Sequence, residues 1–415
     1  MHPLSISGIA IATAAGLGLE QTYAALRDRR SGLRPNDFES FPYPTWIGRV
    51  AALETSAITG PLADFDCRNN RMANLSLQQD GFQDAVARAR DRHGARRIAT
   101  LIGTSTSGIF ETELAYQSGA GRDAALASRN YDRTHSLFSV SEFVRRALHL
   151  EGPAATVSNA CASSAKVFAQ AERLMAAGIC DAAVVGGVDS LCLTTLHGFK
   201  SLELLSASPC RPWDAGRDGI SIGEAGGFVL LEKTPAAHQP GLHRPGVAPN
   251  GVASSGVASG GVALLGYGES SDGYHMSSPH PEGAGAVLAM SGALARAGLQ
   301  PQDVDYINLH GTATVANDRA EDAAVYTVFG EATPASSTKG WTGHALGAAG
   351  IVEAIVSVLC LARGFAPGTL NTRERDPALR CRMLLENEQQ ALRTVLSNSF
   401  GFGGNNCSLL FGRID

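Results

Sequence analysis

The sequence predicts an α/β fold in which short apolar strands alternate with longer helices. Three observations support this class: a globular composition, β-like runs at intervals along the chain, and helical stretches of about 10–15 residues between them. The 415 residues are 44% hydrophobic and 18% charged, which excludes a disordered or collagen-like chain. A chain of this length forms roughly two to four modules or one large α/β unit.

The expected strands begin near the N-terminus, where Leu4–Ile11 is apolar. No Lys or Arg precedes this run and Glu20 follows it, so we interpret it as a buried strand and not as a signal peptide. No other stretch has ~18 uninterrupted apolar residues, so we expect no membrane-spanning helix. The other predicted strands are Ile98–Gly103, Asp181–Val188, Phe228–Glu232, Val304–Asn308, Arg393–Leu396 and Cys407–Phe411, with Arg380–Leu385 as a possible further strand, and the predicted helices are Ser163–Ala177 and Ala284–Ala297.

Two segments share a layout and suggest that the chain has two related halves. Ala155–Val188 and Ser336–Gly364 each contain a turn of small residues followed by an apolar helix and a glycine. We place the halves at 1–245 and 246–415. Four Gly-Val-Ala units follow this boundary with a period of five, from Gly246 to Leu265. We interpret them as an insertion tolerated on a surface loop, with a specialised loop or β-edge surface as the alternative.

The charge pattern excludes several function classes. The chain has 34 Lys+Arg against 39 Asp+Glu and contains no run of basic residues, which argues against binding to nucleic acid. Its eight cysteines include no CxxC pair, so a zinc ribbon is not expected. Scattered cysteines in a chain of this length are typical of reduced thiols in the cytoplasm.

Cys161 is the candidate nucleophile. The segment Thr156–Ala165 runs from an apolar extended stretch into small residues and then into a helix. This pattern predicts a tight turn at a helix N-terminus, where the helix dipole favours the nucleophilic thiolate. A small buried residue with no chemical role is the alternative.

Two histidines occupy settings rich in glycine and small residues. His310 opens the sequence HGTAT, after an apolar strand, and His344 lies in KGWTGHALGAAG, near a helix start that would keep its ring neutral. Either residue could instead be a core or packing histidine. Lys339, which opens the second motif, is either a solvated turn residue or a buried charge paired with Glu353.

The segment Ser397–Asn406 reads SNSFGFGGNN. Glycines on both sides of Phe402 leave a backbone that can offer an N–H group to an oxyanion. A glycine-rich hairpin is the alternative. The segment is not a phosphate-binding P-loop, because it has no Lys followed by Ser or Thr and it precedes a strand. Together with one cysteine and two histidines, it suggests a site for nucleophilic acyl transfer.

In this order, the Cys161 turn, HGTAT, KGWTGHALGAAG and SNSFGFGG resemble the β-ketoacyl-acyl-carrier-protein synthases. GFKSLELLS, RPWDAGRDGISIGEAGG and SSDGYHMSSPHPEG strengthen the resemblance, which covers nearly the whole chain. It implies a thiolase-like fold, with two related βαβαβαββ halves in a five-layer αβαβα sandwich. The half 1–245 would carry the nucleophile, and the half 246–415 both catalytic histidines.

The resemblance also assigns roles to single residues. It implies that Cys161 is acylated and that His310 and His344 stabilise the enolate formed when malonyl-carrier protein loses CO₂. Lys339 would pair with Glu353, and the N–H groups of Cys161 and Phe402 would form the oxyanion hole. The remaining implied residues are Thr312 and Thr314 for the pantetheine arm, Phe199, Phe402 and Thr106 for the substrate pocket, and Asn308, Glu353, Ser397 and Asn398 for an optional cation site.

The partners implied are acyl-carrier protein, loaded with acyl or malonyl groups, and a second subunit in a homodimer or a heterodimer. No cofactor and no membrane is implied. Acidic carrier proteins need a local basic patch on a chain that is acidic overall, and we predict Arg68 and Arg71 for it. A solvated helix face is the alternative for these two arginines.

The branch of the family is predicted from finer features. Two catalytic histidines argue against starter-condensing enzymes, and Cys161 argues against a chain-length factor. Gly103–Ile109, Arg68–Arg71 and Ser190–Thr195 look like ketosynthases of aryl-polyene pigment clusters, with fatty-acid elongation as the alternative. We disfavour a non-catalytic partner subunit, and also a coenzyme A-dependent thiolase, because Cys407 lies beyond the glycine-rich motif in an expected strand.

Overall fold

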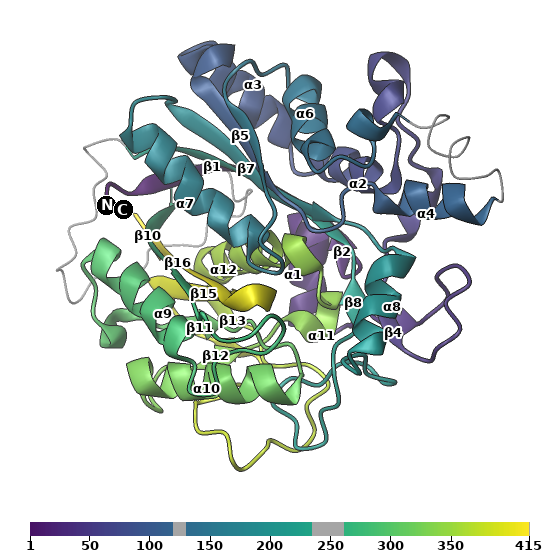
Figure 1. Cartoon of the computed structure of the whole chain (residues 1–415). Coiled ribbons are helices and arrows are strands. Elements are labelled where there is room, and N and C mark those ends of the chain that lie inside the picture. The colour runs from purple at the N-terminus through teal and green to yellow at the C-terminus, as the bar shows by residue number, and fades with distance from the viewer. Residues whose placement is uncertain (119–129, 235–260, 415) are drawn as a thin grey trace.

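A computed structural model describes residues 1–118, 130–234 and 261–414 (Figure 1). In this part of the chain, one long mixed sheet runs through both halves of the molecule. Its strand order is β12 (Ala335–Ser336), β11 (Tyr306–Asn308), β15 (Thr394–Gly401), β16 (Asn405–Arg413), β10 (Val262–Ser271), β1 (Leu4–Thr13), β9 (Ala225–Lys233), β7 (Ala182–Asp189), β5 (Ile98–Gly103) and β6 (Ala154–Val157).

Two apolar helices form the central layer. α7 (Ser163–Ala176) packs on β5 and β7, α12 (Ala349–Arg363) packs on β9 and β15, and the two helices contact each other. Their side chains share one hydrophobic cluster with both parts of the sheet. Because strands cover the helices on both sides, the segments that precede α7 and α12, with Cys161 and His344, are buried inside the molecule.

Outer helices cover the other faces of the sheet and complete five layers. On the N-terminal half these are α2 (Arg68–Leu77), α3 (Phe82–His93) and α6 (Phe138–Ala147), and on the C-terminal half α9 (Ala284–Ala297) and α10 (Val315–Phe329). Figure 1 shows the first group above the central helices and the second group below them. The layered α/β prediction is confirmed.

Within the described residues, one helical stretch, Leu346–Arg363, is long and apolar enough to cross a membrane, but 89% of it is buried inside the protein. It comprises a short 3₁₀ turn and α12, the core helix described above. Its hydrophobicity therefore reflects packing between two layers of strands, as in a soluble protein.

The predicted elements differ from the observed ones mainly at their ends. β5 and α9 have the predicted bounds, whereas β15 extends to Gly401. The possible strand Arg380–Leu385 is not formed in full: this segment makes only an isolated parallel bridge, from Met383 to Ala335 of β12. Its first N–H groups, of Arg380 and Cys381, donate to the Asp322 carboxylate on α10, which removes them from any strand ladder.

The Gly-Val-Ala repeat and the boundary between the halves lie largely outside the described residues. The last unit of the repeat, Gly261–Leu265, leads into β10, a strand inside the sheet, so for this unit the surface-loop interpretation is wrong. The other units and the division at 245/246 fall within 235–260, and they stay predictions.

Candidate active site

Cys161 lies in a tight turn just before α7, as predicted. Ala160, the preceding residue, has a φ of 48°, a left-handed conformation that costs energy for a residue with a side chain. Cys161 is only 6% exposed, and burial raises the pKa of its thiol to about 12, although the nearby Lys339 ammonium and the Phe402 N–H oppose this rise. The expected preference for a thiolate is therefore wrong for the resting site, and the thiol needs a base.

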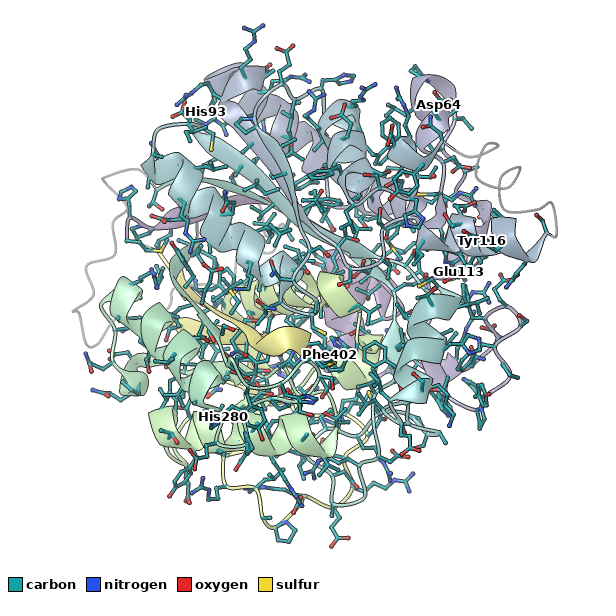
Figure 2. All side chains as sticks on the ribbon, in the orientation of Figure 1. Asp64, His93, Glu113, Tyr116, His280 and Phe402 are labelled. Carbon is teal, nitrogen blue, oxygen red and sulfur yellow. The ribbon has the colours of Figure 1, made fainter. Side chains whose placement is uncertain are left out.

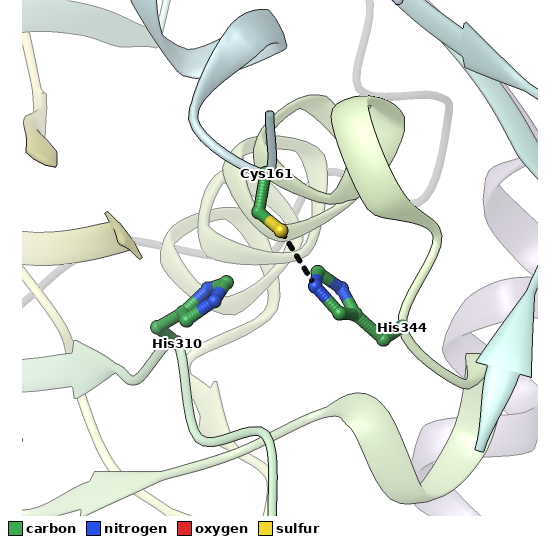
Figure 3. Close-up of side chains that lie close together, drawn as sticks. All are labelled: Cys161, His310 and His344. Carbon is green, nitrogen blue, oxygen red and sulfur yellow. Dashed lines mark hydrogen bonds between the residues drawn. The ribbon is translucent and has the colours of Figure 1, made fainter. Parts of the chain in front are cut away.

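His344 and His310 both face the thiol (Figure 3). His344 Nε2 lies 2.9 Å from Cys161 Sγ, and the two imidazole rings meet edge to face, with centroids 5.2 Å apart. Ligand atoms of all three residues lie within 4.8 Å of one another. Burial, together with the charge of Lys339, lowers both histidine pKa values well below the usual range, so both rings are neutral.

Lys339 is buried and paired with Glu353, so it is the buried charge of the two alternatives and not a solvated turn residue. Its ammonium also donates to the His310 backbone carbonyl and lies 3.4 Å from His310 Nδ1. Because an ammonium can only donate, Nδ1 must be the acceptor. The single ring proton of neutral His310 is thereby placed on Nε2.

Glu321 is a site residue that sequence reasoning missed. Its two carboxylate oxygens accept the backbone N–H groups of His310 and Gly311, each at 2.8 Å. Burial raises its pKa to about 7. A buried carboxylate on α10, eleven residues after His310, thus fixes the loop on which this histidine sits. The acidic character of VANDRAED was visible in the sequence, but its inward direction was not.

The substrate pocket opens over the thiol and has a volume of about 180 Å³. Phe402 follows β15 near the middle of the molecule (Figure 2), and its ring packs against Phe199 with centroids 5.6 Å apart. Thr312 and Thr314 line the pocket, and their hydroxyls lie 3.0 Å apart. Thr106 does not line it; its hydroxyl bonds to a buried carboxylate. Its role as a pocket residue stays a prediction.

Of the four residues of the predicted cation site, Asn308 contacts Glu353, because its side-chain amide donates to the Glu353 backbone carbonyl at 3.2 Å. Asn308 and Ser397 are register partners on β11 and β15, and each has a buried side-chain oxygen without a hydrogen-bond partner. Oxygens of this kind suit a hard cation. The Asn398 side chain is already used, because it donates to Glu321 and accepts from Ser408. Asn308, Ser397 and Glu353 therefore fit a cation better than Asn398 does.

The predicted docking pair is not a free basic patch. Arg68 is 5% exposed, and its guanidinium binds the fully buried Glu224 carboxylate at 2.7 and 2.9 Å. For Arg68 the docking prediction is corrected, because its charge faces inward and is neutralised. Arg71 is partly exposed but also paired, with Asp66. Docking by Arg71 stays a prediction.

Comparison with protein families decides the identity of this site. The β-ketoacyl synthase N-terminal domain matches residues 1–237 and the C-terminal domain matches residues 262–373. The chain belongs to the β-ketoacyl synthase family. The resemblance, the thiolase-like fold and the acyltransferase class predicted from the sequence are confirmed.

Similar proteins span nearly the whole chain. The mitochondrial 3-oxoacyl-[acyl-carrier-protein] synthase of Arabidopsis thaliana is 31% identical, covering 99% of this chain and 93% of its own. A ketosynthase, ApeO, from Xenorhabdus doucetiae, solved in complex with its chain length factor, is 37% identical with a TM-score of 0.87 over 99% of this chain and 98% of its own. The ishigamide ketosynthase/chain length factor is 28% identical with a TM-score of 0.85, over 99% of each chain.

Proposed function

We propose that the protein is a β-ketoacyl-acyl-carrier-protein synthase, which extends an acyl chain by decarboxylative condensation with malonyl-carrier protein. The convergence of Cys161, His310 and His344 within 4.8 Å is the observation that carries this proposal. The set combines a nucleophile with two neutral imidazoles in a buried pocket, which suits thioester chemistry.

In the first half-reaction the acyl group moves to Cys161. His344 Nε2, 2.9 Å from the sulfur, takes the thiol proton, and the sulfur attacks the carbonyl of the acyl-carrier thioester. The N–H groups of Cys161 and Phe402 hold the resulting oxyanion. The carrier C–S bond then breaks, the acyl–Cys161 thioester remains, and the pantetheine sulfur takes the proton back from His344 Nε2 and leaves as a thiol.

In the second half-reaction malonyl-carrier protein enters with its thioester carbonyl against the two histidines. The bond to the carboxylate breaks, CO₂ leaves, and the electron pair forms an enolate that the His310 and His344 N–H groups stabilise. The enolate carbon attacks the Cys161 thioester and forms the new C–C bond. The Cys161 C–S bond breaks, and the sulfur leaves as thiolate.

We further place the enzyme in aryl-polyene chain elongation, together with a related partner subunit. The 37% identical ketosynthase ApeO is described in complex with its chain length factor, which supports the related partner subunit. Fatty-acid elongation is the second candidate, supported by the 31% identical Arabidopsis thaliana synthase. All eight cysteines are free and buried, which suits the reducing cytoplasm as the location.

Two other readings fit the geometry less well. A non-catalytic partner subunit would not need Cys161 and both histidines assembled around one pocket. A thiolase would need a second reactive cysteine, but Cys407 lies fully buried within β16 and does not line the pocket.

The test is decarboxylation and condensation by the purified protein with malonyl- and acyl-carrier protein. Cys161→Ala should abolish condensation and labelling by thiol-directed acyl mimics. His310→Ala and His344→Ala should each slow CO₂ release by ~10²-fold or more, the scale of losing one oxyanion donor. Labelling at Cys192 or Cys210, or unchanged CO₂ release in both histidine variants, would contradict the proposal.

A further inference from the structure

Asp189 is a buried carboxylate with no part in the chemistry above. It is the last residue of β7, is fully buried and does not line the substrate pocket. Its oxygens accept hydrogen bonds from the Thr104 and Thr106 hydroxyls and from the N–H groups of Ser105, Thr106 and Gly347, at 2.6–3.0 Å. Both oxygens accept from N–H groups, so the geometry favours the ionised form although burial raises the pKa of Asp189.

The donors come from two segments that position the reacting groups. On one side, the Ser105 hydroxyl also donates to the carbonyl of Ala160, the strained residue before Cys161, at 3.3 Å. On the other side, Gly347 follows His344 by three residues. One carboxylate therefore links the nucleophile turn of the N-terminal half to the histidine segment of the C-terminal half.

This junction leaves little room for adjustment. A Cβ atom on Gly347 would lie 2.6 Å from the Ser105 hydroxyl oxygen and 2.8 Å from an Asp189 oxygen. Leu346, between His344 and this glycine, has a φ of 53°. Strained backbone persists only where the surroundings over-determine it, and here the Asp189 carboxylate is part of those surroundings.

We propose that Asp189 is a positioning residue, which holds the His344 segment in register with the Cys161 turn by accepting hydrogen bonds from both sides. The proposal rests on the condensing activity proposed above. Asp189 acts through His344 and Cys161 and does not touch substrate. Its loss should therefore reduce turnover without weakening the binding of malonyl-carrier protein, because Asp189 does not line the pocket.

The test compares Asp189→Asn with Gly347→Ala, which disturbs the same contact without changing charge. Both variants should lower kcat for malonyl-carrier decarboxylation by ~10²-fold, the cost of misplacing a reacting group by about 1 Å. KM should stay within about twofold of the parent value. Asp80→Asn is the matched control, because Asp80 is another carboxylate that accepts a backbone N–H, from Leu19, and should leave kcat unchanged.

A second readout separates positioning from a general loss of structure. The Asp189 charge raises the pKa of the Cys161 thiol, so Asp189→Asn should move the pH profile of iodoacetamide alkylation to lower pH, and Gly347→Ala should not. Parental kcat in both variants, a change confined to KM, or an equal loss in Asp80→Asn would overturn the proposal. If the parent released no CO₂, the proposed function would fail, while the alkylation profile would still test the Asp189 contact.

Discussion

Two of the buried ion pairs in the described part of the chain have opposite consequences. Arg68–Glu224 and Lys339–Glu353 are similarly buried, with side chains no more than 6% exposed. In the first pair, the Glu224 oxygens also accept the N–H groups of Val50 and Leu191, so both carboxylate oxygens are saturated. In the second pair, the ammonium also reaches the His310 ring, and burial raises the Glu353 pKa to about 7.

The difference shows how the surroundings assign a role to a charge pair. A guanidinium presents a rigid fork that fits one carboxylate, whereas an ammonium is a compact charge with rotatable donors. Arg68 therefore links α2 to the residue before β9, and its N–H groups are used in these bonds and do not point to a reacting group. Lys339 fixes the tautomer of a catalytic ring. Burial alone does not distinguish these roles, but a further contact of each cation does: Arg68 donates to the Glu54 carboxylate, whereas Lys339 reaches the His310 ring.

The largest expected effect comes from breaking the structural pair. Arg68→Ala leaves Glu224 as an uncompensated charge in the interior, which should lower the free energy of unfolding by about 3–5 kcal/mol. Urea denaturation measures this. Arg71→Ala on the same helix is the matched control and should cost less than about 1 kcal/mol, because its pair with Asp66 is partly exposed. Similar losses in both variants would mean that the Arg68 pair is not special.

A third buried carboxylate, Glu321, has no cation as a hydrogen-bond partner and should make stability depend on pH. Burial outweighs the hydrogen bonds that its oxygens accept from His310 and Gly311 and raises its pKa from 4.5 to about 7, so the folded state holds the proton more tightly than the unfolded state. The stabilisation is complete below pH ~4.5 and is lost as pH rises through ~7, by about 3 kcal/mol. The free energy of unfolding, measured at several pH values, should depend less on pH in Glu321→Gln than in the parent. Parallel curves for parent and variant would contradict the assignment.

Sequence patterns predicted the catalytic residues better than the surroundings that hold them. Cys161, His310 and His344 stand in short motifs that carry their own local geometry, and each lies where it was expected. Glu321 and Asp189 are remote in sequence from the groups they hold, and a lone acidic residue has no local signal for facing inward. Arg68 was misplaced for the same reason, because its partner Glu224 is 156 residues away.

Removing the Lys339 cation should affect chemistry more than stability. In Lys339→Met, Glu353 can take up a proton, because its pKa is already about 7 and rises further without the ammonium. The His310 ring loses the donor that places its proton on Nε2, so decarboxylation should slow by ~10²-fold. The free energy of unfolding should fall less than in Arg68→Ala. Single-turnover CO₂ release and urea denaturation measure the two effects. If Lys339→Met lowered the free energy of unfolding as much as Arg68→Ala, the Lys339–Glu353 pair would be structural like the Arg68–Glu224 pair.

The smallest effect is expected at the surface pair Arg71–Asp66, which tests what remains of the docking prediction. Arg71 is about one quarter exposed and binds Asp66 through two hydrogen bonds of 2.5 and 2.7 Å, so little of its charge is free for an acidic carrier. Arg71→Gln should raise KM for acyl-carrier protein by only about twofold, and the effect should shrink at high salt, where exposed charges are screened. Turnover of a small pantetheine thioester should not change, because the catalytic residues are untouched. Arg88→Gln, an exposed position on α3 with the same change of charge, is the control. Equal KM changes in both variants would show a general charge effect and place carrier docking elsewhere.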